Sequence, residues 1–375
     1  MKDYIFIYCE NYNTKLITSK FHFINYLLKK NSRIIYVESP ISILSIIFNL
    51  KIFFENFKKL FSYEKRDNLI ITNNICFLPF HRFFRINLFN KINQIFNVYK
   101  INRIIRKYNF NDINLIIYSP LINDQIDKIN NINKKIFIIN DDYSAFDEKY
   151  SSDLIKSYCN NIFKKSNFIF YNSNYCLNNL ITKENLIRQK NTLKISHGVT
   201  KKNNKFTSKL KKIRNIFYYG QINKINSNVI LDLARKYDNL NFHIFGNLKN
   251  SDYIKFSNLN NLNLYKSIDR DKLMQIISKF DIALFPFLNN NLTNSMLPIK
   301  IYEMLNLNIP IITSKLSSIY EIFKNNVYYI SEKNIDYDFT KIIHSLENTN
   351  YFRHFEIAEW DDIFSKMEKN INESI

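Results

Sequence analysis

The stretch from Asp281 to Ser314 has the residue pattern that points most directly to chemistry. It is typical of a strand, a loop rich in Asn, Thr and Ser, a short helix opened by Pro298, and a second strand. Proline suits the first helical turn because that turn needs no N–H from it. A helix N-terminus at the ends of parallel strands binds anions and nucleotides. Glu303, farther along the same helix, can accept hydrogen bonds from sugar hydroxyls.

Two adjacent acids, Asp141 and Asp142, follow a predicted buried strand at residues 135–140. Carboxylates just beyond the C-terminal end of a strand fit a position in a ligand cleft. A helix cap is the alternative, because Asp side chains accept hydrogen bonds from unpaired backbone N–H groups. The residues alone leave both interpretations open.

The chain contains three glycines, Gly198, Gly220 and Gly246, and each directly follows or ends a predicted strand. Glycine adopts a positive φ at little cost and lets a ligand or another backbone come close. In a composition this poor in glycine, a retained glycine predicts such a requirement. A tight turn without a ligand is the alternative at each position.

Strands and helices alternate along most of the chain, which predicts an α/β fold with parallel sheets. The expected strands are residues 4–9, 33–38, 113–119, 135–140, 167–172, 213–219, 242–245, 262–265, 281–287, 311–314 and 327–330. The expected helices include residues 17–30, 154–165, 175–182, 269–280, 319–323, 337–346 and 357–371. A further helix would be capped by Asn226 or Ser227. Residues 201–212 are polar and basic, which is typical of a linker between two domains.

The composition bounds the class of protein. With 375 residues, of which 46% are hydrophobic, the chain can form two domains with real cores, and global disorder is excluded. The net charge of +20 favours anionic partners such as nucleotides, anionic lipid surfaces or nucleic acid. The four cysteines are scattered without CxxC or metal-ligand spacing, so we expect neither a disulfide framework nor a metal site.

The sequence predicts no targeting segment. Lys2 and Asp3 lead straight into a strand-like run, which is unlike a signal peptide. The longest apolar stretch, residues 41–54, is interrupted by polar residues and falls short of the roughly 20 apolar residues of a spanning helix. We expect a cytoplasmic protein, and attachment to the inner face of the cell membrane stays open.

Two basic and aromatic segments occupy residues 40–63 and 81–108. One interpretation is a pair of ordinary surface helices that pack on the sheet. The other is a membrane-surface patch, because aromatic rings suit the bilayer interface and cations suit anionic lipid. Nucleic-acid binding is disfavoured, since the chain contains no recognised nucleic-acid motif.

The motifs of this chain, taken in the order in which they occur, resemble those of the group-1 family of retaining glycosyltransferases with the GT-B fold. PIKIYEMLNLNIPIITS at residues 298–314 resembles the family pattern P-x-K-x-Y-E-x-L-A-x-G-x-P-V-V-A-T. DDYSAF at 141–146 resembles the DDWSAF segment of bacterial cell-surface glycan members. ISHGV at 195–199 resembles the PNGV or PHGV segment that ends the first domain, and FYYGQI and HIFG resemble the first strands of the nucleotide domain.

The resemblance implies two Rossmann-like parallel-sheet domains that face a cleft. They would be an acceptor domain at residues 1–200, the linker at 201–212 and a nucleotide-sugar domain at 213–350. Residues 351–375, which contain Trp360, would form a helix that packs back on the first domain. The implied reaction moves a hexose from a UDP or GDP sugar to a lipid-linked or surface-polysaccharide acceptor.

The resemblance also implies roles for individual residues. Glu303 would bind the donor ribose, and Gly220 would let the backbone approach the phosphates. Asp141 and Asp142 would face the acceptor or the donor sugar as catalytic groups. The other candidates are the catalytic cation Lys300, the donor-binding residues Lys224, Asn294, Ser295 and Pro298, and the cleft residues His197, Gly198 and Gly246.

The chain departs from the family pattern at three functional positions. Ser295 stands where the family often carries a second Glu. Gln221 and Ser227 stand where many members place Arg and Lys against the diphosphate. Lys224 and Lys300 are nearby cations that can replace them, in which case neither a metal ion nor a cofactor is needed. The alternatives to glycosyl transfer are a non-catalytic nucleotide-sugar or glycan binder and a sugar-nucleotide epimerase.

Overall fold

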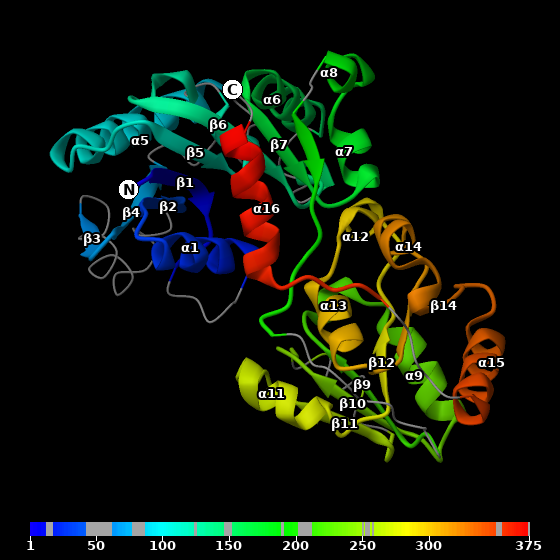
Figure 1. The fold of residues 1–375 in the computed structure, drawn as a ribbon. Coiled ribbons are helices and arrows are strands. Elements are labelled where there is room, and N and C mark those ends of the chain that lie inside the picture. Colours follow the sequence, from blue (N-terminus) through cyan, green and yellow to red (C-terminus); the bar gives the residue numbers. More distant parts are fainter. Residues whose placement is uncertain are drawn as a thin grey trace. The chain divides into compact units, whose positions relative to one another are not determined.

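The chain folds into two compact units, each with its own β-sheet (Figure 1). The computed structural model describes residues 1–12, 18–42, 62–76, 87–123, 126–145, 152–188, 191–201, 212–249, 251, 256, 259–349 and 355–373. Unit 1 comprises Met1–His197 and Trp360–Ile375, and unit 2 comprises Gly198–Glu359. Most of the predicted linker, residues 202–211, lies outside the described residues.

Unit 1 contains an eight-stranded sheet in the order β3-β4-β2-β1-β5-β6-β7-β8. Its strands are β1 (Asp3–Cys9), β2 (Arg33–Ser42), β3 (Tyr63–Arg66), β4 (Leu69–Cys76), β5 (Ile113–Ile117), β6 (Ile132–Ile139), β7 (Phe168–Tyr171) and β8 (Thr192–Lys194). Neighbouring strands are parallel except β3 and β4, which form a hairpin. The strand order reverses between β1 and β5, and ligands usually bind at such a switch point.

The hairpin was not expected from the sequence, which predicts no strand between residues 38 and 113. In the structure β2 continues to Ser42, and β3 and β4 extend the sheet. The turn between β3 and β4 passes through Asp67 with a φ of 44°, a conformation that Asp tolerates better than most residues. Polar residues in β4, among them the buried Thr72 and Asn74, conceal its strand pattern. Residues 43–61 and 81–86 of the two basic segments lie outside the described part of the chain.

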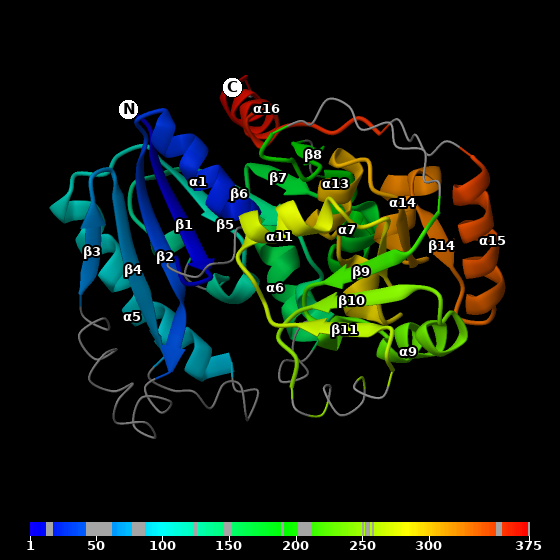
Figure 2. The same ribbon diagram turned by 90° about the horizontal axis from the view of Figure 1, so that it is seen from below.

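Helices cover both faces of the unit 1 sheet, with α1 and α16 on one face and α5 and α6 on the other (Figure 2). They are α1 (Ser19–Lys29), α5 (Asn87–Lys107), α6 (Ser152–Lys165), α7 (Asn174–Leu180), α8 (Lys183–Arg188) and α16 (Trp360–Glu373), with short 3₁₀ helices η1 (Pro120–Ile122), η2 (Ile126–Lys128) and η3 (Tyr143–Ala145). Alternation along β1 sends Ile5 and Ile7 to the α5 and α6 face and Phe6 to Phe23 of α1. Phe23 in turn stacks on Phe364 of α16, with 4.7 Å between ring centroids.

Unit 2 contains a six-stranded, fully parallel sheet in the order β11-β10-β9-β12-β13-β14. Its strands are β9 (Asn215–Tyr219), β10 (Asn241–Phe245), β11 (Leu262–Tyr265), β12 (Ile282–Phe285), β13 (Ile311–Ser314) and β14 (Tyr328–Ile330). The helices are α9 (Ser227–Lys236), α11 (Arg270–Ile277), α12 (Asn291–Ser295), α13 (Ile299–Asn306), α14 (Ser317–Phe323) and α15 (Ile335–Asn348), with 3₁₀ helices η4 (Ile222–Lys224) and η5 (Lys324–Asn326). Asn226 caps α9 as predicted, accepting from the Asn228 N–H at 3.2 Å.

The stretch between β12 and β13 contains one element that the sequence does not predict. The polar loop forms the short helix α12, closed by a capping box in which Asn290 and Thr293 bond each other's backbone N–H groups. α13 then begins after Pro298, as expected. Asn308, at the position of the glycine in the resembled family pattern, has a φ of 53°, a left-handed conformation that Asn tolerates better than most residues.

Within the described residues, no helix is long and apolar enough to cross a membrane.

Candidate functional site

The strand order of unit 2 reverses between β9 and β12, so their C-terminal ends form its switch point. Gly220 directly follows β9, and its N–H donates to the Phe245 carbonyl at 2.9 Å. Its φ is 129°, and a Cβ built there would lie 2.5 Å from the Lys300 Nζ atom. The predicted requirement for glycine is therefore confirmed at Gly220, and it comes from both the backbone conformation and the neighbouring ammonium group.

The other two glycines differ from Gly220. A Cβ on Gly246 would lie 2.5 Å from the Gly220 carbonyl oxygen, so this glycine allows two neighbouring strand ends to pack closely. Gly198 lies just before the bridge that joins Val199 to Glu359, and it has no positive φ. Ligand contacts for these two glycines stay predictions.

The ammonium group of Lys300, in the first turn of α13, lies among aromatic rings. Nζ donates to the Tyr219 carbonyl at 2.7 Å. The four surrounding ring centroids, of Tyr218, Tyr219, Phe285 and Phe287, lie 4.9 to 5.5 Å from Nζ. Burial and the positive charge of Lys224 lower the pKa of Lys300 to about 7. An anion bound beside this lysine would restore its positive charge.

Lys224 and the residues just before α13 also belong to this candidate site of unit 2. Lys224, the last residue of η4, places its Nζ 3.2 Å from the Met296 sulfur. Ser295 is fully buried, and its hydroxyl donates to the Leu292 carbonyl at 2.8 Å. Pro298 is the residue that precedes the first helical residue of α13. The first N–H groups of a helix have no partners within the helix, so they add to the positive potential here.

Glu303 is held by two residues that the sequence analysis does not single out. Tyr219 donates its hydroxyl to Oε2 at 2.7 Å. Arg270, the first residue of α11, donates from Nε to Oε1 at 3.1 Å and also pairs with Oε1 through Nη2. The Glu303 side chain is 11% exposed, so solvent still reaches the carboxylate. Arg270 directly follows Asp269, the residue that caps α11, but no local signal links it to Glu303.

Asn294 lies in α12, and its side chain forms hydrogen bonds with nearby residues of unit 2. Its amide nitrogen donates to the Asn290 carbonyl at 3.0 Å and to the Asn289 side chain at 2.7 Å. Its oxygen accepts from the backbone N–H and the hydroxyl of Ser317 at 2.9 and 3.0 Å. Asn294 thus joins α12 to the start of α14. Its contact with the nucleotide-sugar donor stays a prediction.

In unit 1, Asp142 is fully buried and caps the 3₁₀ helix η3. Its Oδ1 accepts from the Ser144 N–H at 2.9 Å and from the Ser144 hydroxyl, and its Oδ2 accepts from Asn179. The helix cap, which the sequence leaves as one alternative, is therefore present at Asp142. Asp141 is only partly buried, and its negative charge contributes to the raised pKa of Lys20.

The switch point of unit 1 holds an ion pair that sequence reasoning missed. Glu10, directly after β1, accepts from Lys20 at 2.5 Å and from the Thr18 hydroxyl at 2.6 Å. The Lys20 Nζ also lies 4.9 Å from the centroid of the Tyr118 ring, next to β5. An acid that immediately follows the first strand was the available signal.

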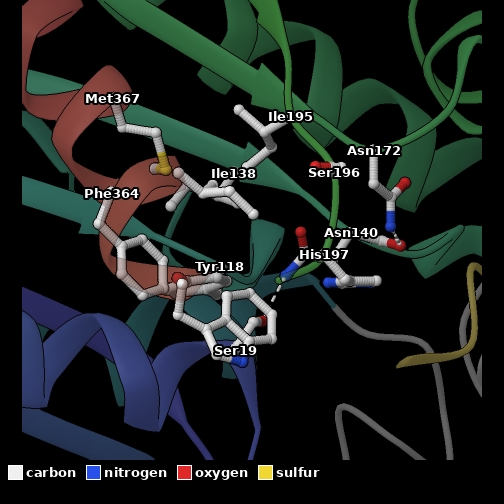
Figure 3. Close-up of a pocket in the computed structure, with 12 residues that line it drawn as sticks. Ser19, Tyr118, Ile138, Asn140, Asn172, Ile195, Ser196, His197, Phe364 and Met367 are labelled. Carbon is white, nitrogen blue, oxygen red and sulfur yellow. Dashed lines mark hydrogen bonds between the residues drawn. The ribbon is translucent and has the colours of Figure 1, made fainter. Parts of the chain in front are cut away.

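His197 lines a small, mostly apolar pocket in unit 1, to which Ser19, Asn140 and Asn172 add polar groups (Figure 3). The Asn172 amide donates to the Asn140 carbonyl at 2.5 Å, and the Asn140 amide reaches the Ser19 hydroxyl at 3.5 Å. The His197 ring lies edge-on to Trp360, with 5.8 Å between centroids. The pocket volume of about 10 Å³ corresponds to a single water molecule.

Within the described residues, no group of three His, Cys, Asp or Glu side chains could hold a metal ion.

The chain is similar to known glycosyltransferases. Residues 200–356 match the family model of group 1 glycosyl transferases. Over the full length of both chains it is similar to the OtsA apo structure, with 11% identity and a TM-score of 0.68. It is also similar over both full lengths to a glycosyltransferase from Rickettsia africae, with 16% identity and a TM-score of 0.59.

A third similar structure is described as trehalose-6-phosphate from E. coli bound with UDP-2-fluoro glucose. The identity is 9% and the TM-score 0.60, over 99% of this chain and 95% of the other. No curated protein matches the sequence. The predicted GT-B fold is confirmed by these structural similarities and by the two parallel-sheet units.

Proposed function

Because residues 200–356 match the family model of group 1 glycosyl transferases and the chain has the GT-B fold, we propose that the protein transfers a hexose from a UDP or GDP sugar with retention of configuration. The acceptor would be a lipid-linked or surface-polysaccharide glycan at the inner face of the membrane. The observation that carries this proposal is the uncompensated Lys300 ammonium beside Gly220, at the switch point of unit 2.

In this proposal Lys300 and Lys224 neutralise the leaving diphosphate. Lys300 lies at the start of α13, where helix N–H groups add positive potential. Phosphate oxygens next to Gly220 would meet Lys300 first, because the absence of a Cβ opens that approach. These protein cations would do the work that a divalent metal does in other transferases.

Glu303 would recognise the donor ribose. Carboxylate oxygens accept hydrogen bonds from hydroxyl groups, and Glu303 already accepts from Tyr219 and Arg270. Those two donors hold the carboxylate in one orientation, which reduces the entropy lost when the sugar binds. Pro298 and Ser295 would shape the approach to this helix, and Asn294 would support it by joining α12 to α14.

In unit 1, we assign the acceptor to the C-terminal ends of β1, β5 and β6. Asp141, which lies just past β6, would face the acceptor hydroxyl, while the buried cap Asp142 would hold the following turn. Glu10 and Lys20 form a charged pair at the switch point of this sheet. His197 lines the small pocket described above.

Purified protein should be incubated with a panel of UDP and GDP sugars, with and without glycan acceptors, and sugar release should be measured. We expect hydrolysis of one donor, faster turnover with acceptor, and retention of configuration by NMR. Lys300→Ala should abolish turnover, and Lys279→Ala, an exposed lysine of the same unit, should not. A folded protein that binds none of these donors would refute the proposal.

A non-catalytic binder is the second candidate, and Ser295, Gln221 and Ser227 at family positions of charged residues favour it. Calorimetric binding of a UDP or GDP sugar without turnover would support that alternative. A sugar-nucleotide epimerase would convert the donor without any acceptor, and NMR of the recovered donor would reveal the new sugar.

A further inference from the structure

Helix α5 has three large apolar side chains that are at least half exposed to solvent. One side of the helix, with Val98, Ile101, Ile104 and Ile105, is buried in the core. On the other side Ile95 is 51% exposed, Phe96 50% and Tyr99 64%. Large apolar side chains grouped in this way on a surface mark an interaction site more often than single ones do.

Exposed cations flank these three side chains. Lys91 precedes them, and Arg103, Arg106 and Lys107 follow them along the exposed side of the helix. α5 contains no Asp or Glu, so no acid on the helix compensates this charge. Lys100 does not belong to this face, because its Nζ donates to the Asn73 carbonyl at 2.9 Å.

Helix α5 lies at one side of the unit 1 sheet. The helix lies on the face of the sheet opposite α1 and α16, along the β4 side of unit 1 (Figures 1 and 2). Its spacing brings Lys91, Ile95 and Tyr99 into one row, since residues four apart lie above one another on a helix. Arg103 continues that row, and Phe96 lies beside it.

We propose that this face of α5, named the α5 face and formed by Lys91, Ile95, Phe96, Tyr99, Arg103 and Arg106, docks on an anionic lipid surface. Aromatic and aliphatic side chains with an adjacent cationic row match the boundary between headgroups and acyl chains. The cations pair with lipid phosphates, and the apolar side chains lose their exposure to water. This docking would bring the enzyme close to a lipid-linked acceptor, so its biological purpose rests on the proposed function.

Nucleic acid fits the α5 face less well. A phosphate backbone would use the cations, but it would leave Ile95 and Phe96 exposed. A bilayer interface uses both kinds of side chain. The charge and the apolar surface therefore favour lipid over nucleic acid.

The test is sedimentation of the full chain with phosphatidylcholine vesicles, with and without phosphatidylglycerol, at low and high salt. We expect sedimentation with phosphatidylglycerol that weakens as salt rises. The variant Ile95→Ser/Phe96→Ser/Tyr99→Ser should lose roughly tenfold or more in vesicle partitioning. The control Ile187→Ser/Tyr337→Ser, at side chains 84% and 67% exposed, should bind like the unaltered protein.

A second variant tests the charges separately. Lys91→Gln/Arg103→Gln/Arg106→Gln should remove the preference for phosphatidylglycerol. The matched control Lys164→Gln/Lys183→Gln/Lys279→Gln removes equal charge at exposed positions and should keep the preference. The proposal is overturned if each variant binds vesicles like its control, or if phosphatidylglycerol does not increase binding. It is also overturned if the protein binds RNA in a low-salt retardation assay but does not bind vesicles.

These outcomes are independent of catalysis. Donor hydrolysis in solution should be equal in the α5 variants and the unaltered protein, because none of the altered residues lies in the donor site. Unchanged hydrolysis also shows that the variants are folded. Failure of the proposed function would instead appear as absent hydrolysis with vesicle binding intact.

Discussion

The two switch points of the molecule both hold a lysine beside aromatic rings, but their electrostatics are opposite. In unit 1, burial disfavours the charge of Lys20, but interactions with Cys9 and with the paired Glu10 outweigh burial and raise its pKa. In unit 2, burial and Lys224 lower the pKa of Lys300 to about 7, and Glu303 opposes them only weakly. Among the described residues, the first cation therefore forms an ion pair with an acid of the protein, whereas the second forms none.

This difference separates a preformed ion pair from a buried cation that, in our proposal, a ligand neutralises. Glu303 is the acid nearest in sequence to Lys300, yet Arg270 and Tyr219 already occupy its oxygens. The ammonium of Lys300 has only rings and one carbonyl as partners among the described contacts. A buried cation of this kind costs stability in the free protein and gains interaction energy when phosphate binds.

The largest expected effect comes from removing the two lysines in turn. Lys300→Met should reduce kcat by about 10²–10³-fold, the typical loss when one stabilising contact to a developing anion is removed. It should leave Tm unchanged or raise it, because a buried unpaired charge disappears. Lys20→Met should instead lower Tm, since Glu10 loses its partner. Turnover and thermal unfolding of both variants check the contrast, and equal changes in Tm would contradict it.

The next prediction uses the glycine beside Lys300. Gly220→Ala should destabilise the fold by about 1–3 kcal/mol, because alanine at a φ of 129° is strained and its Cβ displaces the ammonium. Donor affinity should fall in the same variant. Gly198→Ala is the control, since that residue has no positive φ. Denaturant unfolding and calorimetric donor titration measure both effects, and a Gly198→Ala loss of equal size would remove the special role of Gly220.

The pH dependence of binding gives a smaller and sharper signal. The free-protein pKa of Lys300 is about 7, and a bound diphosphate raises it, so binding takes up a proton near neutral pH. Affinity for UDP or GDP should therefore weaken as pH rises above 7. Calorimetry in buffers of different ionisation enthalpy measures the proton uptake directly. In Lys300→Met the uptake should vanish, and its persistence would assign the proton to another group.

Linkage predicts the sign of the stability change for the same lysine. The folded pKa lies below the ordinary value of 10.5, so the unfolded chain binds more protons between pH 7 and 10.5. The Lys300 contribution to the free energy of unfolding therefore rises with pH in that window and is least favourable below pH 7. Comparing unfolding of the unaltered protein and Lys300→Met across this range isolates it. The same comparison made with Lys20→Met should show no such rise, because the pKa of Lys20 is raised in the folded protein.

The smallest effects concern the pairs around Glu303. Arg270→Met should weaken donor binding by about tenfold or less, because the partly exposed pair orients Glu303 and does not itself carry the diphosphate. Glu303→Gln should cost more, since a neutral amide is a weaker acceptor for ribose. A double-mutant cycle in donor affinity measures the coupling. Zero coupling would mean that Arg270 plays no part in positioning Glu303.

Local patterns predicted most of the elements. Apolar runs such as residues 113–119 and 282–285 are buried strands whatever surrounds them, and Asn226 and Pro298 begin helices through their own chemistry. Two elements that the sequence did not predict, β4 and α12, contain polar residues that are uncommon in a strand or in a helix. β4 ends in an Asn-rich segment, and α12 lies in a loop whose Asn and Thr residues were expected to favour turns.

The sequence by itself determined the alternating α/β organisation and the helix starts, because these depend on neighbours within a few positions. Only the tertiary structure decided which charges meet. Arg270 reaches Glu303, and Tyr219 and Phe285 surround Lys300, because parallel strands far apart in the chain end at one edge of the sheet. Burial at that edge then sets the pKa of Lys300, a property that no local pattern of residues contains.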